Sequence, residues 1–466
     1  MQNQYDISSP KRQEGQELSQ EVAQKLEEFL LPFVIALDKI LDKRLVRTLV
    51  CCCVAILRFR NSMQGLLLSE LGSYLDGYQG VSVSAAAGTK RISNLLHSLK
   101  WSILQIDQFL LDEADTKVKS LKADGKRILA PWDTSVIEKP ESEKLEGLSP
   151  VVSSKAKRRN RSKKGLVFNF PPRKTITVVG MQWTGVLITG VEGTVKVAMM
   201  HWWTTKGDYA TNLRKKEEEM LRTCMKRWGD LILYVFDRGY GTGPWLEVLE
   251  TLRVRFVIRW KHGLVFIDAQ GREKKLWQIG LGKKYLTQKM IRDKETGLKV
   301  QCDLWWTPVR HASSSSQLYL VKARVKGQIW YLITNDRVRT EEDAWDVFFA
   351  YRRRWQIETS FRYGKSELAM ESPQVRFLEH RLKLLGIVTL VYAFLLHLLL
   401  EDNLILVKSI LHLKCHRTGK WQKEVIAPLY RLRWAISRLW DDFHPLLGFF
   451  FPPNLETVRA LAAFRH

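Results

Sequence analysis

The chain has 466 residues, of which 45% are hydrophobic, so it is long and apolar enough for two or three domains with a sizeable core. This composition, with 17 tryptophans, excludes a disordered chain. The formal net charge of +25 predicts an acidic partner, most simply the phosphates of nucleic acid, with an anionic membrane surface as the alternative.

Residues 1–120 are predicted to be helical, since apolar residues recur there at intervals of three and four positions. A short helix over residues 88–101 would carry Lys90, Arg91 and Lys100. These bases indicate either a helix that docks on DNA or an ordinary solvated face. We assign residues 1–120 to a helical DNA-binding domain.

The cysteines predict a reduced, cytoplasmic protein. Three of the six are contiguous, at residues 51–53, and lie among Leu, Val and Ile, which is typical of small buried apolar residues. The chain shows no paired zinc-ligand spacing, and residues 1–20 lack the apolar stretch of a secretory signal.

From about residue 127 the pattern predicts an α/β domain. Three strands, a helix, a strand, a helix and a strand follow one another up to residue 260, in the order of a mixed sheet. Residues 153–165, between the first two strands, carry seven bases and no acid. We expect a mobile loop there that contacts phosphate, although a nuclear-localisation signal has a similar composition.

The rest of the chain completes this domain and adds helices. Residues 261–327 are strand-rich and read as an insertion, after which a strand and a helix starting near residue 341 resume the core. We place the catalytic domain over residues 121–400 and a helical region, a candidate dimerisation element, over 401–466. Residues 384–400 are almost wholly apolar but short for a membrane span, so we favour a buried core helix over a transmembrane helix.

Three acids stand out in this cationic chain. Asp133 lies within a predicted strand, where aspartate is disfavoured. Asp237 follows a predicted strand, at the end where open α/β sheets bind ligands, although aspartate there also forms turns and helix caps. Glu358 lies among the bases of YRRRWQIETSFRYGK.

On a continuous helix, Tyr351, Arg354, Glu358 and Lys365 would fall within an arc of about 60°. Taken alone, this stripe is explained by an Arg–Glu pair on a solvated face. Together, the three acids suggest another role. Two divalent ions roughly 4 Å apart stabilise both oxygens of an in-line phosphodiester displacement, and hard ions such as Mg²⁺ require oxygen ligands.

The pattern Tyr, two residues, Arg, three residues, Glu, six residues, Lys resembles the signature of bacterial insertion-sequence DDE transposases of the insertion-sequence family 4 group. The sequences PWDTS and FDRGYG around the two aspartates resemble the two aspartate motifs of that family. The spacing of the three acids is similar to that in members with a β insertion before the glutamate.

The resemblance implies a ribonuclease-H-like mixed-sheet core, with residues 1–120 binding transposon ends. It implies a homodimer that bridges two double-stranded DNA ends, and a nucleoid-associated protein of the bacterial cytoplasm. The three acids would bind two Mg²⁺ ions, for which Mn²⁺ can substitute, while Tyr351, Arg354 and Lys365 would contact phosphates near the scissile bond. Some relatives hold a flipped base with an aromatic from the insertion, but neither Trp305 nor Trp306 matches a motif.

Three other functions remain to be separated from an active transposase that excises and inserts its own element. A catalytically idle, transposase-derived DNA-binding regulator would have no need of three intact carboxylates. A related nuclease that cuts without joining would use the same metals. A membrane protein rests on residues 384–400 alone.

Overall fold

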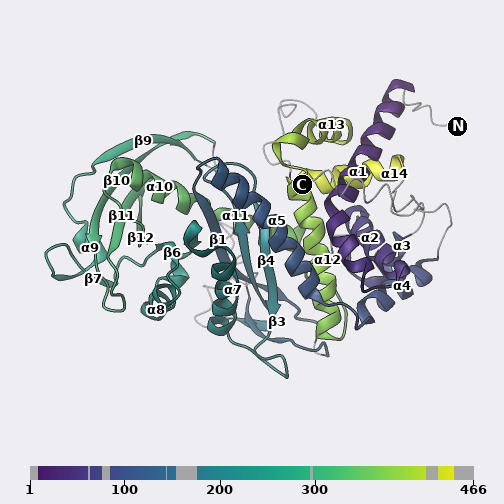
Figure 1. Ribbon diagram of the computed structural model, residues 1–466, viewed down its shortest axis with the longest axis horizontal. Coiled ribbons are helices and arrows are strands. Elements are labelled where there is room, and N and C mark those ends of the chain that lie inside the picture. The colour runs from purple at the N-terminus through teal and green to yellow at the C-terminus, as the bar shows by residue number, and fades with distance from the viewer. Residues whose placement is uncertain are drawn as a thin grey trace, which may run out of the picture.

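The structure is a computed structural model, and it describes residues 9–60, 63–75, 84–142, 144–153, 176–293, 297–415 and 429–445. Apart from Ser153, the basic loop predicted over residues 153–165 lies outside these residues. Figure 1 shows a large sheet flanked by helices and, beside it, a layer built from the first and last helices of the chain.

The first part of the chain is helical, as predicted. Its helices are α1 (Ser9–Asp38), α2 (Lys43–Arg58), α3 (Leu68–Ser73), α4 (Ala85–His97) and α5 (Ile103–Ala123). Side chains cap several of these helices, and Ser102 and Gln105 form a capping box at the start of α5. α4 ends at His97, so Lys100 lies in the turn after the helix and not on it as predicted.

The central sheet is mixed and contains ten strands. Its main-sheet strands are β1 (Ile128–Glu138), β2 (Ser149–Val152), β3 (Thr177–Ile188), β4 (Lys196–Trp203), β5 (Ile232–Phe236), β6 (Arg255–Arg259), β9 (Thr287–Arg292), β10 (Lys299–Val309), β11 (Leu318–Val325) and β12 (Gln328–Thr334). The order is β2-β3-β1-β5-β6-β12-β11-β10-β9, and β4 pairs with β3 off this path. β5 runs parallel to both β1 and β6, whereas the other pairs are antiparallel.

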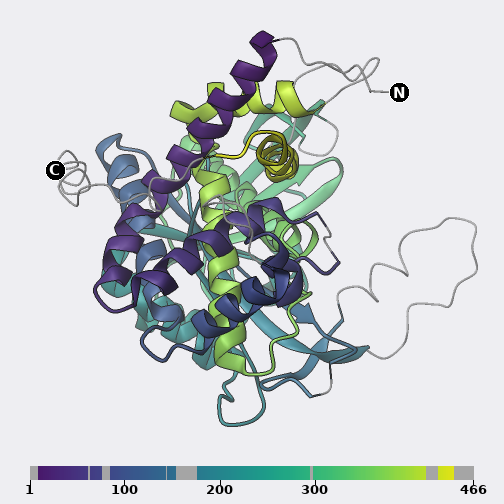
Figure 2. The ribbon, with the colours of Figure 1, turned by 90° about the vertical axis from the view of Figure 1, so that its right-hand side faces the viewer.

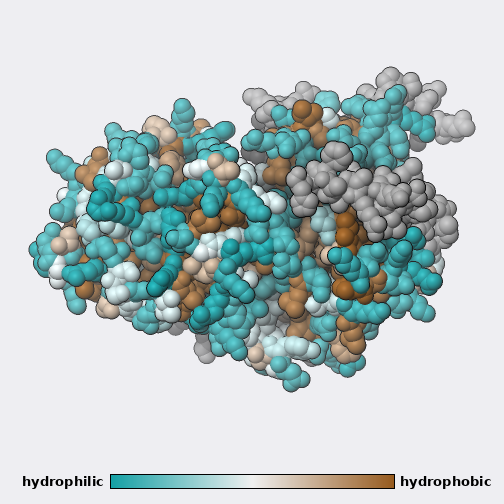
Figure 3. Space-filling model, viewed as in Figure 1, coloured by the Kyte–Doolittle hydropathy of each residue, from teal (hydrophilic) through white to brown (hydrophobic). Residues whose placement is uncertain are grey.

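Most of the predicted insertion, residues 261–327, joins the sheet of the core. Three of its strands, β9 to β11, extend the central sheet through β12. The remaining elements of the insertion are a small hairpin and one helical turn: β7 (Val265–Ile267), β8 (Glu273–Lys275) and α9 (Leu276–Ile279). The surface on this side of the molecule is mainly hydrophilic, with apolar side chains scattered over it (Figure 3).

Helices cover both faces of the sheet. They are α7 (Leu213–Trp228), α8 (Gly243–Thr251), α10 (Glu341–Arg352), α11 (Trp355–Ser366) and α12 (Leu378–His397), with short 3-10 turns η1 (Gly229–Leu231) and η2 (Arg238–Tyr240). Trp132 and Phe236 pack on one face with α5, α7 and α8. Leu129 and Val235, one residue out of phase, pack on the other face with α10.

The apolar segment 384–400 lies mostly in α12, which is a core helix. By length and composition α12 could cross a membrane, but its side chains are almost all buried, and it packs against α2, α4, α5 and β4. Figure 2 shows it running through the middle of the helical layer. The last described helices are η3 (Glu401–Asn403), α13 (Leu404–Lys414) and α14 (Leu429–Asp442).

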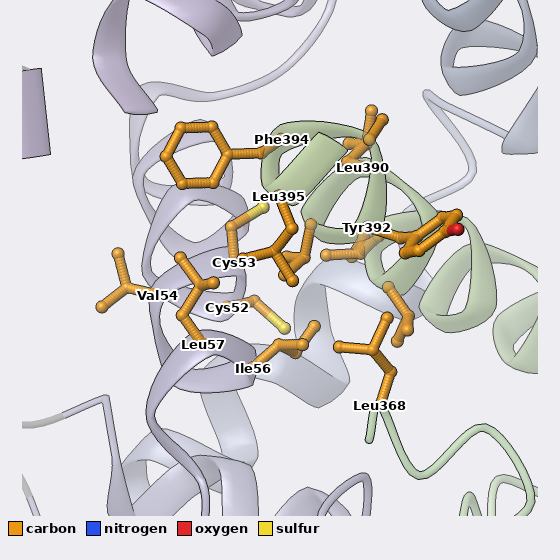
Figure 4. Packing of buried hydrophobic residues seen from close by; sticks show 14 of the residues in the cluster. Cys52, Cys53, Val54, Ile56, Leu57, Leu368, Leu390, Tyr392, Phe394 and Leu395 are labelled. Atoms are coloured by element: carbon orange, nitrogen blue, oxygen red, sulfur yellow. The ribbon is translucent and has the colours of Figure 1, made fainter. Parts of the chain in front are cut away.

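The contiguous cysteines take part in this core. Cys52 and Cys53 are fully buried on α2 and face Leu395 and Phe394 of α12 (Figure 4). All six cysteines of the chain are free thiols, and burial raises the pKa of Cys52 to about 12. Cys51 is only half-buried. The prediction of small buried apolar residues thus holds for Cys52 and Cys53.

Helices from the two ends of the chain share one hydrophobic core. This core contains side chains of α1, α2, α4 and α5 together with side chains of α12, α13 and α14. The N-terminal helices therefore pack directly on the rest of the molecule. The domain boundaries at residues 120 and 400 stay a prediction.

Candidate active site

Asp133 and Asp237 occupy matching positions on neighbouring parallel strands. Pro131 of β1 pairs with Val235 of β5, and each aspartate lies two residues beyond its paired residue. Because side chains alternate across a strand, Asp237 lies on the same face as Val235, the face that α10 covers. Asp133 lies on this face by the same rule, so the structure places both aspartates at one edge and on one face of the sheet.

α11 brings Glu358 to the same edge by packing against β1 and β3. Gly185 of β3 pairs with Asp133 of β1. A Cβ atom on Gly185 would lie 3.0 Å from Ile357 Cδ1 and 3.1 Å from Phe361 Cε1, both on α11. The missing side chain at this position thus makes room for the helix, and Glu358 follows Ile357 directly.

The helix predicted to carry the four signature residues on one stripe is interrupted, so that prediction is wrong. In the turn between α10 and α11, the Arg354 amide donates to the Tyr351 carbonyl at 3.1 Å, a 3-10 interval. Arg353 in the same turn donates to Thr189 Oγ1 at 2.6 Å and to the Gly193 carbonyl at 2.5 Å. Tyr351 therefore belongs to α10, whereas the other three signature residues belong to the start and body of α11.

Arg354 joins two of the predicted carboxylates. Its Nη1 donates to Asp133 Oδ2 at 3.1 Å, and its Nη2 donates to Glu358 Oε1. Burial lowers the pKa of Arg354, but the charges of Tyr351, Glu358 and Asp133 outweigh burial and raise it. The guanidinium therefore stays charged inside a largely buried site.

The carboxylates act on one another electrostatically. Burial first, and then the charge of Asp237, raise the pKa of Asp133 to about 7 against the opposing charge of Arg354. Glu358 adds a smaller rise. Asp133 and Glu358 thus share one guanidinium, with the charge of Asp237 close by. The oxygen atoms of these three acids are the donors that a hard divalent cation requires.

As the side chains lie, these acids do not yet form a metal cage. Among the described residues, no group of three or more His, Cys, Asp or Glu side chains is placed so as to hold a metal ion. The guanidinium of Arg354 bridges Asp133 and Glu358 instead. The carboxylate oxygens are donors that Mg²⁺ accepts, but two of the three acids contact Arg354 in this arrangement.

Tyr351 lies against two residues that the sequence did not single out. Trp330 of β12 contacts the Tyr351 ring edge to face at 5.7 Å, and the Arg259 guanidinium lies 5.4 Å from the centre of the Trp330 ring. Burial raises the pKa of Tyr351, while Arg354 and Arg259 oppose the rise. Arg259 is the last residue of β6, one position beyond the last pair of β5 and β6. Its place at the end of a predicted strand was therefore the available sequence signal that it lies near the site.

The aromatics considered in the sequence lie elsewhere. Trp305 is buried in the hydrophobic core on the α7 face of the sheet. Trp306 is only partly buried and packs against the core on the α10 face. Trp330 is thus the aromatic from this part of the sheet that contacts a signature residue.

A fourth acid, Glu217 of α7, lies behind the aspartates and was also missed. Glu217 is 1% exposed, and the Tyr240 hydroxyl donates to its Oε1 at 2.5 Å. The pKa of Glu217 is raised to about 7, mainly by burial and slightly by the charge of Asp237, while the hydrogen bond from Tyr240 opposes the rise. An acid at an inward position of the amphipathic helix 213–228 was the available sequence signal.

Of the three predicted DNA contacts, Arg354 bonds to two of the acids, and Tyr351 lies close enough to Arg354 for the two charges to interact. Lys365 is half-buried in the last turn of α11. Lys90 and Arg91 are exposed on α4, as either sequence interpretation of that helix requires.

Residues 211–394 match the family of the transposase DDE domain. This segment contains all the predicted site residues except Asp133. No curated protein matches the chain. A solved structure described as the cryo-EM structure of a piggyBac transposase synaptic complex with hairpin DNA is similar at 12% identity and a TM-score of 0.33. The alignment covers 72% of this chain and 56% of that chain, so the present chain spans about half the length of that transposase. The domain match supports a DDE transposase.

Proposed function

We propose that the chain is a cut-and-paste DNA transposase of the insertion-sequence family 4 group. The observation that carries this proposal is that Asp133, Asp237 and Glu358 lie near one another, with Arg354 at the start of the helix that carries Glu358 and Lys365 in its last turn. The strand order β4-β3-β1-β5-β6, with Asp133 and Asp237 each two residues past the last pair of β1 and β5, supports a ribonuclease-H-like core.

The three carboxylates are the residues that would hold two Mg²⁺ ions, or Mn²⁺ in their place. Bound there, the ions would stabilise the attacking and leaving oxygens of a phosphodiester displacement. Arg354 neutralises Asp133 and Glu358 when no ion is bound. To admit cations, Arg354 gives up at least one of these contacts, and its guanidinium is then free to bind a DNA phosphate.

The remaining signature residues would hold the DNA. Lys365 contacts the strand near the scissile bond, and the Tyr351 hydroxyl shares this role beside Arg354. The net charge of +25 provides attraction to double-stranded DNA, both the transposon ends and the target. A homodimer would bring two ends together in the bacterial cytoplasm.

The test is an assay with the terminal inverted repeats that flank the gene, a target plasmid and Mg²⁺. Joined products support the transposase. Nicks without joining instead indicate the nuclease, and salt-sensitive binding without cleavage indicates the regulator. An Asp133→Asn variant in the same assay shows whether the cleavage belongs to this site.

A further inference from the structure

Glu217 is a buried acid for which the proposed chemistry has no role. It lies on the inward face of α7 in line with Met220, Leu221 and Cys224, which are all at most 1% exposed. An apolar residue is expected at such a position, because a buried carboxylate is costly unless it is hydrogen-bonded. Its hydrogen bond from the Tyr240 hydroxyl, 2.5 Å long, therefore replaces interactions with water.

Tyr240 belongs to the same short turn as Asp237. The Asp237 side chain caps this turn by accepting from the Gly239 amide, and the Tyr240 amide donates to the Asp237 carbonyl at 3.3 Å. A displacement of Tyr240 would consequently move the backbone of Asp237.

The Tyr240 ring is fixed from several sides. Its centre lies 5.1 Å from that of Phe236 and 5.6 Å from that of Trp245. The hydroxyl bond to Glu217 adds a directional contact from the side chain, which ring packing alone does not supply. α7 itself is anchored to α5 by the contact of Trp228 Nε1 with Asp115 Oδ1 at 2.6 Å.

We propose that Glu217 and Tyr240 are a positioning pair, which holds the turn carrying Asp237 in the orientation that a divalent cation requires. Glu217 acts on Asp237 through Tyr240 and the turn that the two residues share. The inference rests on the proposed function, since it gives Asp237 a cation to bind. Groups behind a metal ligand typically change metal affinity 10- to 100-fold when they are removed.

The experiment compares Tyr240→Phe, which removes only the hydroxyl, with Glu217→Gln, which keeps an acceptor at the same place. Glu218→Gln is the matched control, since Glu218 is the next residue of α7 and pairs with the neighbouring Arg222. The full chain is titrated with Mn²⁺ by calorimetry without DNA, and hydrogen exchange is followed over residues 232–245.

We expect Tyr240→Phe to weaken Mn²⁺ binding about 10-fold and to speed exchange of the turn amides by a similar factor. Glu217→Gln should have a smaller effect on both, and Glu218→Gln none. Unchanged exchange in Tyr240→Phe would overturn the proposal.

A double variant, Tyr240→Phe with Glu217→Leu, separates positioning from stability. Replacing both partners by apolar groups can restore stability, because no buried carboxylate is left unpaired. We expect exchange and Mn²⁺ binding to remain impaired, whereas full recovery of both would show a purely structural pair. Mn²⁺ binding by the wild-type protein should be lost in Asp237→Ala. If it is not, the proposed function fails, but the exchange data still decide whether the pair positions the turn.

Discussion

The carboxyl edge of β1 and β5 and the core around α12 use buried side chains in opposite ways. At the sheet edge, Asp133 and Glu358 share the single guanidinium of Arg354, and the acids repel one another. Around α12, residues such as Phe394 and Leu395 are fully buried among apolar neighbours (Figure 4). The helical layer therefore stabilises the molecule, while the sheet edge holds a charge arrangement that folding alone does not favour.

The largest expected effect is a loss of cleavage when an acid at the sheet edge is removed. Asp237→Ala should lower cleavage of transposon ends at least about 1,000-fold, because a metal ligand contributes several kcal/mol to the transition state. End binding should change little, and loss of the cap on the Gly239 amide should lower the free energy of unfolding by only about 1 kcal/mol. Asp230→Ala is the control, since Asp230 is exposed at the other end of the same strand. An equal loss of DNA binding would make Asp237 structural.

A substitution in the helical layer should instead lower stability without changing cleavage. Phe394→Ala should lower the free energy of unfolding by about 3–5 kcal/mol, through lost burial and a cavity. Cleavage per folded molecule should be unchanged. Denaturant unfolding measures the free energy of unfolding. Ile405→Ala, at a position 81% exposed, is the control for removing an apolar side chain from the surface. A loss of activity in fully folded Phe394→Ala would contradict this separation.

The comparison also predicts a pH dependence at the sheet edge. The native pKa of Asp133 is about 7, against an ordinary value of 3.8, so the folded protein binds this proton more tightly than the unfolded chain. Stability of the metal-free protein should therefore fall as pH rises between these values. Denaturant unfolding at pH 5 and pH 8 measures the change, and Asp133→Asn should reduce it. An identical pH dependence in both proteins would remove Asp133 as its source.

The smallest expected effect concerns DNA contact. Lys365→Ala should weaken binding of end DNA and lower the slope of log affinity against log salt by about one unit. Lys126→Ala is the control. Lys126 is an exposed lysine just before β1, away from Asp133, and it pairs with Asp124. A salt slope unchanged by Lys365→Ala would remove that residue from the phosphate contacts.

The sequence predicted those parts of the site that depend on local pattern. Asp133 and Asp237 were placed on a strand and at a strand end because Val, Ile and Trp mark the strands clearly. The break between α10 and α11 was not predictable, because Arg353 bonds to residues distant in the chain. Tertiary contacts of this kind override helical periodicity.

Other features escaped for related reasons. β2 has four residues and lies outside any clear strand pattern. The joining of the insertion to the main sheet depends on the register of β12 with β6, which composition does not encode. The link between Glu217 and Tyr240 joins residues on two different elements, so only the inward acid itself was visible in the sequence.

Because Gly185 has no side chain, the helix that carries Glu358 can pack closely against the sheet. Even a methyl group there would crowd Ile357, Phe361 and Met200, so any larger residue must tilt α11 outward or force those side chains to repack. The lack of a side chain at Gly185 thus sets the distance between β1, which carries Asp133, and α11, which carries Glu358. Engineering that distance requires changing both layers together.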